Sequence, residues 1–287
     1  MTSAIVSGAV IAAVDGSLDS RRGVRWAAGQ AHLERRPLVL VHATGGDNGG
    51  ATTWQRLDDS ISPSQILVQE AVAFAEERYP DLAVRGVSVP DDARSALIDL
   101  SMAAHLLVLG SRGRGPVRSK LLGSVSAKVA KCAACPVVVT RPTQPGAIKD
   151  GVVVGADGTV ESLPVIEFAF RHASLHGLPL TVMHCVDAPA GVVGARGSAF
   201  DIADMEERQV LLAESVAGLS ERYPDVRVRA QLNRGLIEEC LMSGPRPWNL
   251  IVVGRHPIGH LRSSASTAVL ERSHSVVAVV PEAATSG

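Results

Sequence analysis

Residues 105–130 read HLLVLGSRGRGPVRSKLLGSVSAKVA, and no other segment says more about the architecture of the chain. The segment passes from a continuous apolar run through a glycine-rich loop into a helical pattern of apolar residues. In parallel α/β sheets, a loop of this kind lies at the carboxyl end of a strand, where ligands bind. The segment therefore predicts a doubly wound sheet with a ligand site after this strand.

Short apolar runs and helical patterns alternate on both sides of this segment. The first half of the chain has five such runs, predicted as strands, at residues 11–14, 37–43, 83–89, 105–110 and 136–140. Helices are predicted between them at residues 20–35, 62–79, 91–104 and 124–132. Strands that are apolar along their whole length and alternate with helices form a parallel sheet covered on both faces.

The second half of the chain repeats this pattern. ERYPD at residues 77–81 recurs at 221–225, and Asp-Gly at 15–16 recurs at 157–158. The segment 141–151, RPTQPGAIKDG, is rich in Pro and Gly and lacks periodicity, so we expect a linker there. Landmarks that keep their spacing over half a chain indicate the tandem duplication of one α/β domain.

The repeat predicts two domains, residues 1–143 and 149–287. In the second domain, strands are predicted at residues 152–156, 179–185, 226–232, 249–254 and 276–280. Its helices are predicted near residues 162–176, 204–222, 236–243 and 264–273. His42 and His184 end equivalent strands, so we expect them to share a packing or hydrogen-bonding role.

The glycine-rich loop carries the chemistry of the first domain. Its glycines are Gly110, Gly113, Gly115 and Gly123. Glycine lets a backbone turn tightly and approach a ligand closely. Ser124 and the first N–H groups of the following helix would offer donors and a partial positive charge to an anion. Further charge-assisted donors are Arg112, Arg114, Arg118 and Lys120.

Two common phosphate motifs do not fit this loop. The segment GRGPVR lacks the third glycine of GxGxxG, and the chain contains no GxxxxGK[ST]. A nicotinamide-dependent dehydrogenase or a P-loop NTPase is therefore not expected. The plain alternatives are an ordinary strand-to-helix connection for the loop and an ordinary turn for Asp15 and Gly16.

The spacing Gly110-x2-Gly113-x9-Gly123-Ser124 is similar to the ATP-binding signature of the universal stress protein family. The segments LGSRGRG, LLGSVS and CPVVV around it match as well, as does VDGS at residues 14–17. The likeness extends over both halves, so the chain resembles a tandem universal stress protein of the actinobacterial type. This resemblance implies an α/β fold of two Rossmann-like, adenine nucleotide alpha hydrolase-like sheets, each with five parallel strands in the order 3-2-1-4-5.

The same resemblance implies where a nucleotide is held. Asp15, at the end of the first strand, would contact the adenosine, and Val41, at the end of the second, would meet the base through its main chain. The ribose and phosphates would lie against Gly110, Arg112, Gly113, Gly115, Gly123, Ser124, Val125 and Ser126. The implied ligand is ATP with Mg²⁺, and cyclic AMP stays open as an alternative.

The second domain departs from this pattern. Pro257 replaces the second glycine of the loop, and Ser263 replaces the third. Proline removes a backbone donor, and serine adds a Cβ where the backbone must approach phosphate. A weaker second site is expected at Asp157, Gly254, Ser263 and Ser264. The alternative is a degenerate copy that is kept for packing.

Composition narrows the range of partners. A net charge of −1 and a pI near 6.8 provide no long-range field for nucleic acid or an anionic membrane. No apolar run reaches the roughly 20 residues of a membrane helix, so we expect a cytoplasmic protein. Four cysteines in a chain of 287 residues make no disulfide framework. Cys132 and Cys135 have the CxxC spacing, but we expect small buried residues there rather than a redox or metal pair.

The sequence offers no clear catalytic pair. Neither His42 nor His184 has a visible Ser or Cys partner, and no acid/base dyad is evident. Together with the family resemblance, this absence implies a nucleotide-dependent regulator or sensor in a stress or dormancy response. A slow ATPase or self-phosphorylating protein stays open, because Ser124 and Ser126 supply hydroxyl groups beside the expected phosphates.

A third hypothesis is a nucleotide-independent scaffold for other proteins. Exposed strand edges need covering, because their unpaired N–H and C=O groups invite pairing. The last strands of the two domains, at residues 136–140 and 276–280, are expected to pair with each other or to form a homodimer.

Overall fold

The structure is a computed structural model. It describes residues 7–45, 62–113, 122–142, 146–186, 210, 212–214, 216–244, 246–255 and 265–283. The chain divides into two compact units, Met1–Pro142 (unit 1) and Thr143–Gly287 (unit 2). Within the described ranges, no helix combines the length and the hydropathy that crossing a bilayer requires.

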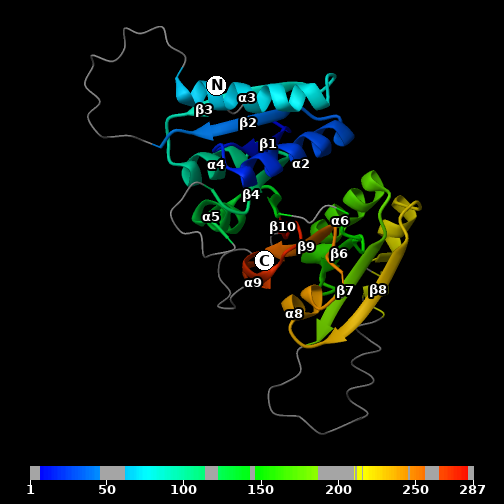
Figure 1. Ribbon diagram of the computed structural model, residues 1–287. Helices are drawn as coiled ribbons and strands as arrows, with labels where there is room; N and C mark the ends of the chain where they lie inside the picture. Colours follow the sequence, from blue (N-terminus) through cyan, green and yellow to red (C-terminus); the bar gives the residue numbers. More distant parts are fainter. Residues whose placement is uncertain are drawn as a thin grey trace. The chain divides into compact units, whose positions relative to one another are not determined.

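Unit 1 contains a parallel sheet of five strands (Figure 1). The strands are β1 (Val10–Ala13), β2 (Leu38–Ala43), β3 (Val84–Val89), β4 (Leu106–Gly110) and β5 (Val137–Thr140). Their order is β3-β2-β1-β4-β5, and every pairing is parallel. This confirms the expected order, and each strand lies within one residue of its predicted ends. Val10 is in register with Leu38 on one side and with Leu106 on the other, so β1 lies at the centre.

Four helices connect these strands. They are α2 (Leu18–Glu34), α3 (Pro63–Arg78), α4 (Ala93–Ser101) and α5 (Ser124–Cys132). α2 packs against α3, and α4 packs against α5. Right-handed crossovers put these two pairs on opposite faces of the sheet, because the winding reverses between β3 and β4. The strands β1 and β4 are buried between the helix layers, as their unbroken apolar sequences require.

Helix starts in unit 1 follow from capping side chains. α2 begins earlier than predicted, because the Ser17 hydroxyl accepts a hydrogen bond from the Ser20 amide and makes Ser17 the N-cap. α4 begins later than predicted, because the Asp92 carboxylate accepts from the amides of Arg94 and Ser95. α3 begins where predicted, with a capping box between Ser62 and Gln65.

Unit 2 has the same parallel topology. Its strands are β6 (Val152–Gly155), β7 (Leu180–Val186), β8 (Val228–Arg234), β9 (Leu250–Arg255) and β10 (Val277–Pro281). Their order is β10-β9-β6-β7-β8, which is again 3-2-1-4-5 when the strands are numbered within the unit. The helical segments are η1 (Val160–Ser162), α6 (Leu163–His176), α8 (Ile237–Met242) and α9 (Ala265–Arg272). Residues 210, 212–214 and 216–222 are also helical.

The duplication extends to local hydrogen bonds. His42 Nδ1 lies 2.6 Å from the Val14 carbonyl oxygen, and His184 Nδ1 lies 2.8 Å from the Ala156 carbonyl oxygen. Each imidazole thus ties the second strand of its unit to the residue that follows the first strand. The expected hydrogen-bonding role of the two histidines is confirmed.

Candidate functional site

The carboxyl end of β1 leads into a tight turn around Asp15. Its carboxylate oxygen Oδ1 accepts a 2.9 Å hydrogen bond from the Ser17 amide. Gly16 between them has a φ of 76°, in the left-handed region that glycine adopts at little cost. The turn holds the Asp15 carboxylate at the edge of the sheet and places Ser17 at the start of α2.

Gly110 lets the end of β4 approach α2 closely. A Cβ at this position would lie 2.6 Å from the Asp19 carbonyl carbon and 2.8 Å from the Ser20 amide nitrogen. Both neighbours are backbone atoms of the first turn of α2, which a side chain could not push aside. The structure therefore requires glycine at position 110 for the packing of helix on strand.

The Asp19 carboxylate joins the first turn of α2 to the glycine loop. The Ser111 hydroxyl donates a 2.8 Å hydrogen bond to Asp19 Oδ2, and Arg112 Nε lies 3.3 Å from the same oxygen. Arg22 forms an ion pair with the other oxygen, Oδ1. The Ser17 hydroxyl also donates to the Arg112 carbonyl at 3.4 Å. This cluster fixes the first residues after β4, which the glycine signature alone does not locate.

A buried cation lies beside this cluster. Arg141 follows β5 and is 4% exposed. Its pKa is lowered to about 10, chiefly because burial disfavours the charged guanidinium and next because Arg112 carries a like charge, while Asp19 raises it. Arg112 and Arg141 thus place two cationic side chains beside the loop, which favours the binding of an anion there.

Gly113 lies against the turn of Asp15. A Cβ at position 113 would come within 2.5 Å of Asp15 Oδ2. The loop after β4 and the turn after β1 therefore meet at the carboxyl edge of the sheet, on the two central strands. This is where a doubly wound sheet binds its ligands.

Gly123 is the N-cap of α5 and supplies no side-chain cap to its first turn. Its φ is −76°, and a Cβ there would make only ordinary contacts, the nearest at 3.5 Å from the Ser111 carbonyl oxygen. Neither backbone conformation nor packing in the described residues demands glycine at this position. Glycine does leave the amides of Ser124 and Val125 accessible to an anion, at the positive end of the helix dipole.

Two predicted ligand residues already have structural roles. The Ser126 hydroxyl donates a 2.7 Å hydrogen bond to the Gly110 carbonyl, which ties α5 to β4. The Val41 carbonyl accepts a 2.8 Å hydrogen bond from the Val14 amide, as part of the ladder between β2 and β1. A nucleotide base at this edge would share the Val41 carbonyl with that amide.

The structure brings together most of the residues predicted for unit 1. Those grouped at the carboxyl ends of β1 and β4 are Asp15, Gly110, Arg112, Gly113, Gly123, Ser124, Val125 and Ser126. Gly115 of unit 1 and Ser263 and Ser264 of unit 2 lie outside the described residues. Sequence reasoning missed Ser17, Asp19 and Arg141, although an acidic residue in the first turn of a predicted helix is a recognisable sign.

Unit 2 repeats the turn but differs from unit 1 at the end of β9. Asp157 Oδ1 accepts a 2.9 Å hydrogen bond from the Thr159 amide, and Gly158 has a φ of 81°, as at Asp15 and Gly16. A Cβ at Gly254, however, would lie 2.0 Å from a carboxylate oxygen of Glu282. An acidic side chain therefore covers the end of β9, whereas backbone of α2 covers the equivalent end of β4. A carboxylate there opposes a phosphate by charge.

Cysteines and metal-binding groups add no further site in the described part of the chain. The four cysteines form no disulfide. Cys135 is buried and Cys132 is half-buried, which agrees with the expectation of small packed residues. The described ranges contain no cluster of three or more His, Cys, Asp or Glu residues that could hold a metal ion.

Known proteins with similar sequences share one family. A family model described as "Universal stress protein family" matches residues 8–141 and 150–281. A universal stress protein of Mycobacterium tuberculosis (strain H37Rv) is 32% identical to this chain. The alignment covers 94% of this chain and 96% of that protein.

A solved structure of similar length has the same fold. A functionally unknown protein from Pseudomonas aeruginosa aligns with a TM-score of 0.63 at 15% identity, covering 98% of this chain and 94% of that one. A universal stress protein in complex with cAMP aligns with 47% of this chain at 26% identity, with a TM-score of 0.37, and 98% of that protein is covered. Two matches to the family model, one in each unit, together account for nearly the whole sequence, and the chain belongs to the universal stress protein family.

Proposed function

We propose that unit 1 binds an adenine nucleotide, ATP with Mg²⁺, and that the chain acts as a nucleotide-dependent regulator or sensor in a stress or dormancy response. The observation that carries the proposal is the start of α5. Gly123 caps this helix without a side chain, although Ser, Thr, Asp and Asn are the usual caps and nothing in the described packing demands glycine. A bound phosphate would satisfy the amides that such a side chain satisfies elsewhere.

The electrostatics around the loop support the same ligand. Arg112 pairs with Asp19, and the charges of both residues affect the pKa of the buried Arg141. A polyphosphate on the loop would lie beside these cationic side chains. The Asp15 turn lies on the other side of Gly113, within reach of the ribose of a nucleotide whose phosphates lie on the start of α5.

The two domains, residues 1–143 and 149–287, have different roles in this proposal. The first holds the nucleotide. The second keeps the turn at Asp157, but Glu282 against Gly254 makes the end of β9 unfavourable for phosphate. We therefore propose that the second domain carries a degenerate copy of the site and that the whole chain binds one nucleotide.

Calorimetric titration of ATP, with Mg²⁺, into the full-length chain tests the proposal. Titrations of AMP and cyclic AMP under the same conditions identify the preferred adenine nucleotide, and mass spectrometry of the purified chain detects any nucleotide already bound. The Gly123→Val variant should lose ATP binding, because the side chain stands over the first amides of α5. Gly218→Ala is the matched control, since Gly218 lies in an exposed helical segment with open space around it.

Binding without turnover distinguishes a sensor from an enzyme. Release of phosphate well above the buffer background, lost in the Gly123→Val variant, would instead assign the chain as a slow ATPase. Phosphate transfer to the chain itself would be detected as an added mass on the segment that contains Ser124 and Ser126. Absence of any nucleotide binding would leave the scaffold hypothesis in first place.

The pairing of the last strands stays a prediction. β5 lies at the end of the strand order of unit 1, and β10 at that of unit 2. We propose that these edges form β-pairings, within one chain, in a homodimer or in both. Light scattering of the full-length chain, with and without ATP, measures the oligomeric state, and a mass that never exceeds one chain would exclude the homodimer.

A further inference from the structure

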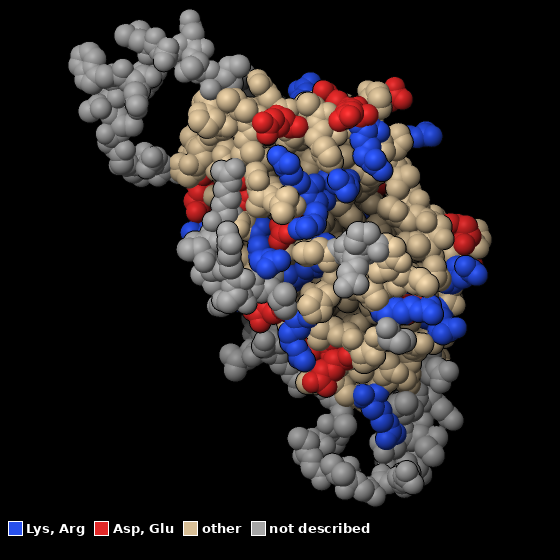
Figure 2. Space-filling model, in the orientation of Figure 1, with Lys and Arg blue, Asp and Glu red and all other residues tan. Residues whose placement is uncertain are grey.

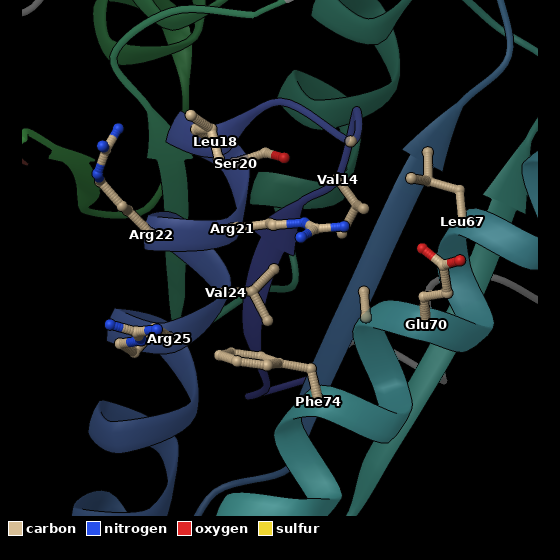
Figure 3. Close-up of a pocket in the computed structure, with 12 residues that line it drawn as sticks. Val14, Leu18, Ser20, Arg21, Arg22, Val24, Arg25, Leu67, Glu70 and Phe74 are labelled. Carbon is tan, nitrogen blue, oxygen red and sulfur yellow. The ribbon is translucent and has the colours of Figure 1, made fainter.

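A cavity of about 660 Å³ lies between α2 and α3 in unit 1 (Figure 3). Its apolar wall is formed by Val14 and Val24 from the side of β1 and α2, and by Leu67, Ala71 and Phe74 of α3. The three α3 residues follow one another at helical spacing, so they make one continuous stripe. This stripe is only half-buried, which leaves apolar surface for a ligand.

The opposite wall is strongly basic. Arg21, Arg22 and Arg25 of α2 all line the cavity. Figure 2 shows Lys and Arg side chains gathered on the face of unit 1 that α2 occupies in Figure 1. Three cations on two turns of one helix repel one another, so their proximity calls for a compensating negative charge.

Two of these three cations have partners in the described structure. Arg22 pairs with the buried Asp19, and the Arg25 guanidinium lies 5.6 Å from the centre of the Phe74 ring. The Arg21 guanidinium has no ion pair or hydrogen bond among the residues that the structure describes. In Figure 3 its side chain extends across the cavity toward α3.

One acidic group, Glu70 of α3, also lines the cavity. Arg22 shares the Asp19 carboxylate with Arg112, and the lining charges outside that cluster are Arg21, Arg25 and Glu70, which are two positive charges and one negative charge. A ligand with a single negative charge would therefore complete the cavity. The volume lies within the range of about 300–1,000 Å³ that small-molecule sites occupy.

We propose that this cavity binds an organic monoanion with an apolar body, of the class of medium-chain or aryl carboxylates. The acidic group of the ligand pairs with Arg21, whose planar guanidinium can hold a carboxylate through two hydrogen bonds. The apolar body lies along Leu67, Ala71 and Phe74. Glu70 faces the same space and limits the ligand to one negative charge.

This site is separate from the proposed nucleotide site. None of Asp15, Gly113 and Gly123 lines the cavity. The two sites adjoin at the turn after β1, where Val14 and Gly16 on either side of Asp15 line the cavity, and at the turn that opens α2. Ser17 and Asp19 form hydrogen bonds with the first residues of the glycine loop. Leu18 and Arg21 line the cavity.

Fluorescence titration with 8-anilinonaphthalene-1-sulfonate, an aromatic monoanion, tests the proposal on the full-length chain. We expect saturable binding of one probe per chain. Octanoate should displace the probe, whereas octylamine, with the same hydrocarbon chain and the opposite charge, should not. Equal displacement by both compounds would overturn the charge-selective site.

Variants of residues that line the cavity test whether the probe binds there. Ala71→Trp fills the space between the helices and should weaken probe binding at least tenfold, whereas Ala73→Trp, at an exposed position of the same helix, should leave it unchanged. Arg21→Gln should weaken binding about tenfold, because a charge-assisted pair is lost, with the exposed Arg85→Gln as its control. Glu70→Gln should strengthen binding.

Circular dichroism shows whether each variant is folded, and the exposed Arg21→Gln keeps the test valid if the tryptophan variant fails to fold. Equal affinity in a folded Ala71→Trp variant would refute the site. Displacement of the probe by ATP combined with an unchanged affinity in Arg21→Gln would also refute it, because the probe would then occupy the nucleotide site.

Discussion

The Ser111 hydroxyl donates a 2.8 Å hydrogen bond to the carboxylate of Asp19, and both residues are buried. The bond links the residue after β4 to the first turn of α2, across the centre of unit 1. Arg22 and Arg112 pair with the same carboxylate, so Asp19 joins two cations to this hydrogen bond.

The Asp19→Asn variant should lose stability and weaken ATP binding at the same time. The amide keeps the shape of the carboxylate but removes its charge, which weakens its contacts with Arg22, Arg112 and Ser111, so the loop after β4 is held less firmly. We expect a loss of about 1–3 kcal/mol in the free energy of unfolding. Urea unfolding and ATP calorimetry measure the two effects. An unchanged affinity would show that the loop does not depend on Asp19.

Gly110→Ala should mainly reduce stability, whereas Gly123→Ala should mainly reduce ATP affinity. A Cβ at Gly110 meets backbone at 2.6 Å, so Gly110→Ala should cost about 1–3 kcal/mol of stability. A Cβ at Gly123 makes ordinary contacts, so Gly123→Ala should change stability by less than about 0.5 kcal/mol while it weakens ATP binding. Thermal unfolding and calorimetry on both variants separate the two roles. Equal ATP affinity in Gly123→Ala and wild type would refute the phosphate contact.

Gly113→Ala should act through Asp15. The new methyl group would lie 2.5 Å from the Asp15 carboxylate in its present position, so the carboxylate must move. If this is the main effect of the substitution, adding Asp15→Ala should cost little more ATP affinity than Gly113→Ala alone. A double-mutant cycle of the two changes measures the coupling. Additive losses would show that the two residues contact the nucleotide independently.

Arg141→Met should preserve stability while it weakens ATP binding. The buried guanidinium is disfavoured by burial and by Arg112, and replacing a buried ion with a well-packed apolar side chain is often neutral or stabilising by about 1 kcal/mol or more. ATP affinity should fall about tenfold, because a cation beside the phosphates is lost. Denaturant unfolding and calorimetry at pH 7 test both parts. A large loss of stability would show that Arg141 is a structural ion.

The pH dependence of the same variant carries its own prediction. The folded-state pKa of Arg141, about 10, lies below the ordinary value of an arginine. Below a pH of about 10 the group is charged in both states, so its unfavourable contribution is complete and constant. Above that pH the folded state releases the proton first, so the stability of the wild type should rise relative to that of Arg141→Met. A difference that stays constant to pH 11 would contradict the lowered pKa.

The alternation of strands and helices could be predicted from sequence because it depends on local pattern. Continuous apolar runs such as residues 137–140 identify parallel strands, and capping residues such as Ser62 identify helix starts. α2 begins two residues earlier than predicted, because Ser17 and Ser20 are both plausible caps and only the structure shows which hydroxyl accepts from which amide.

The contacts of the site were harder to predict. Ser111 and Asp19 are 92 residues apart in the chain, and the local sequence pattern of neither segment predicts their hydrogen bond. The same holds for Glu282 against Gly254, which depends on how the segment after β10 returns over β9. The glycines of the loop could be recognised from the sequence. The distances from a Cβ at each position show that Gly110 serves packing, whereas Gly123 leaves the helix start open.

The first turn of α2 borders both the proposed nucleotide site and the cavity. Ligands that shift this turn when they bind would change each other's affinity. Any displacement of Asp19 that accompanies nucleotide binding also displaces Leu18 and Arg21, one to two residues away on the other side of the same turn. Linkage then requires that an organic anion in the cavity change the nucleotide affinity by the same factor as the nucleotide changes the affinity for the anion. If that factor raises both affinities, the chain would respond most strongly when both ligands are present.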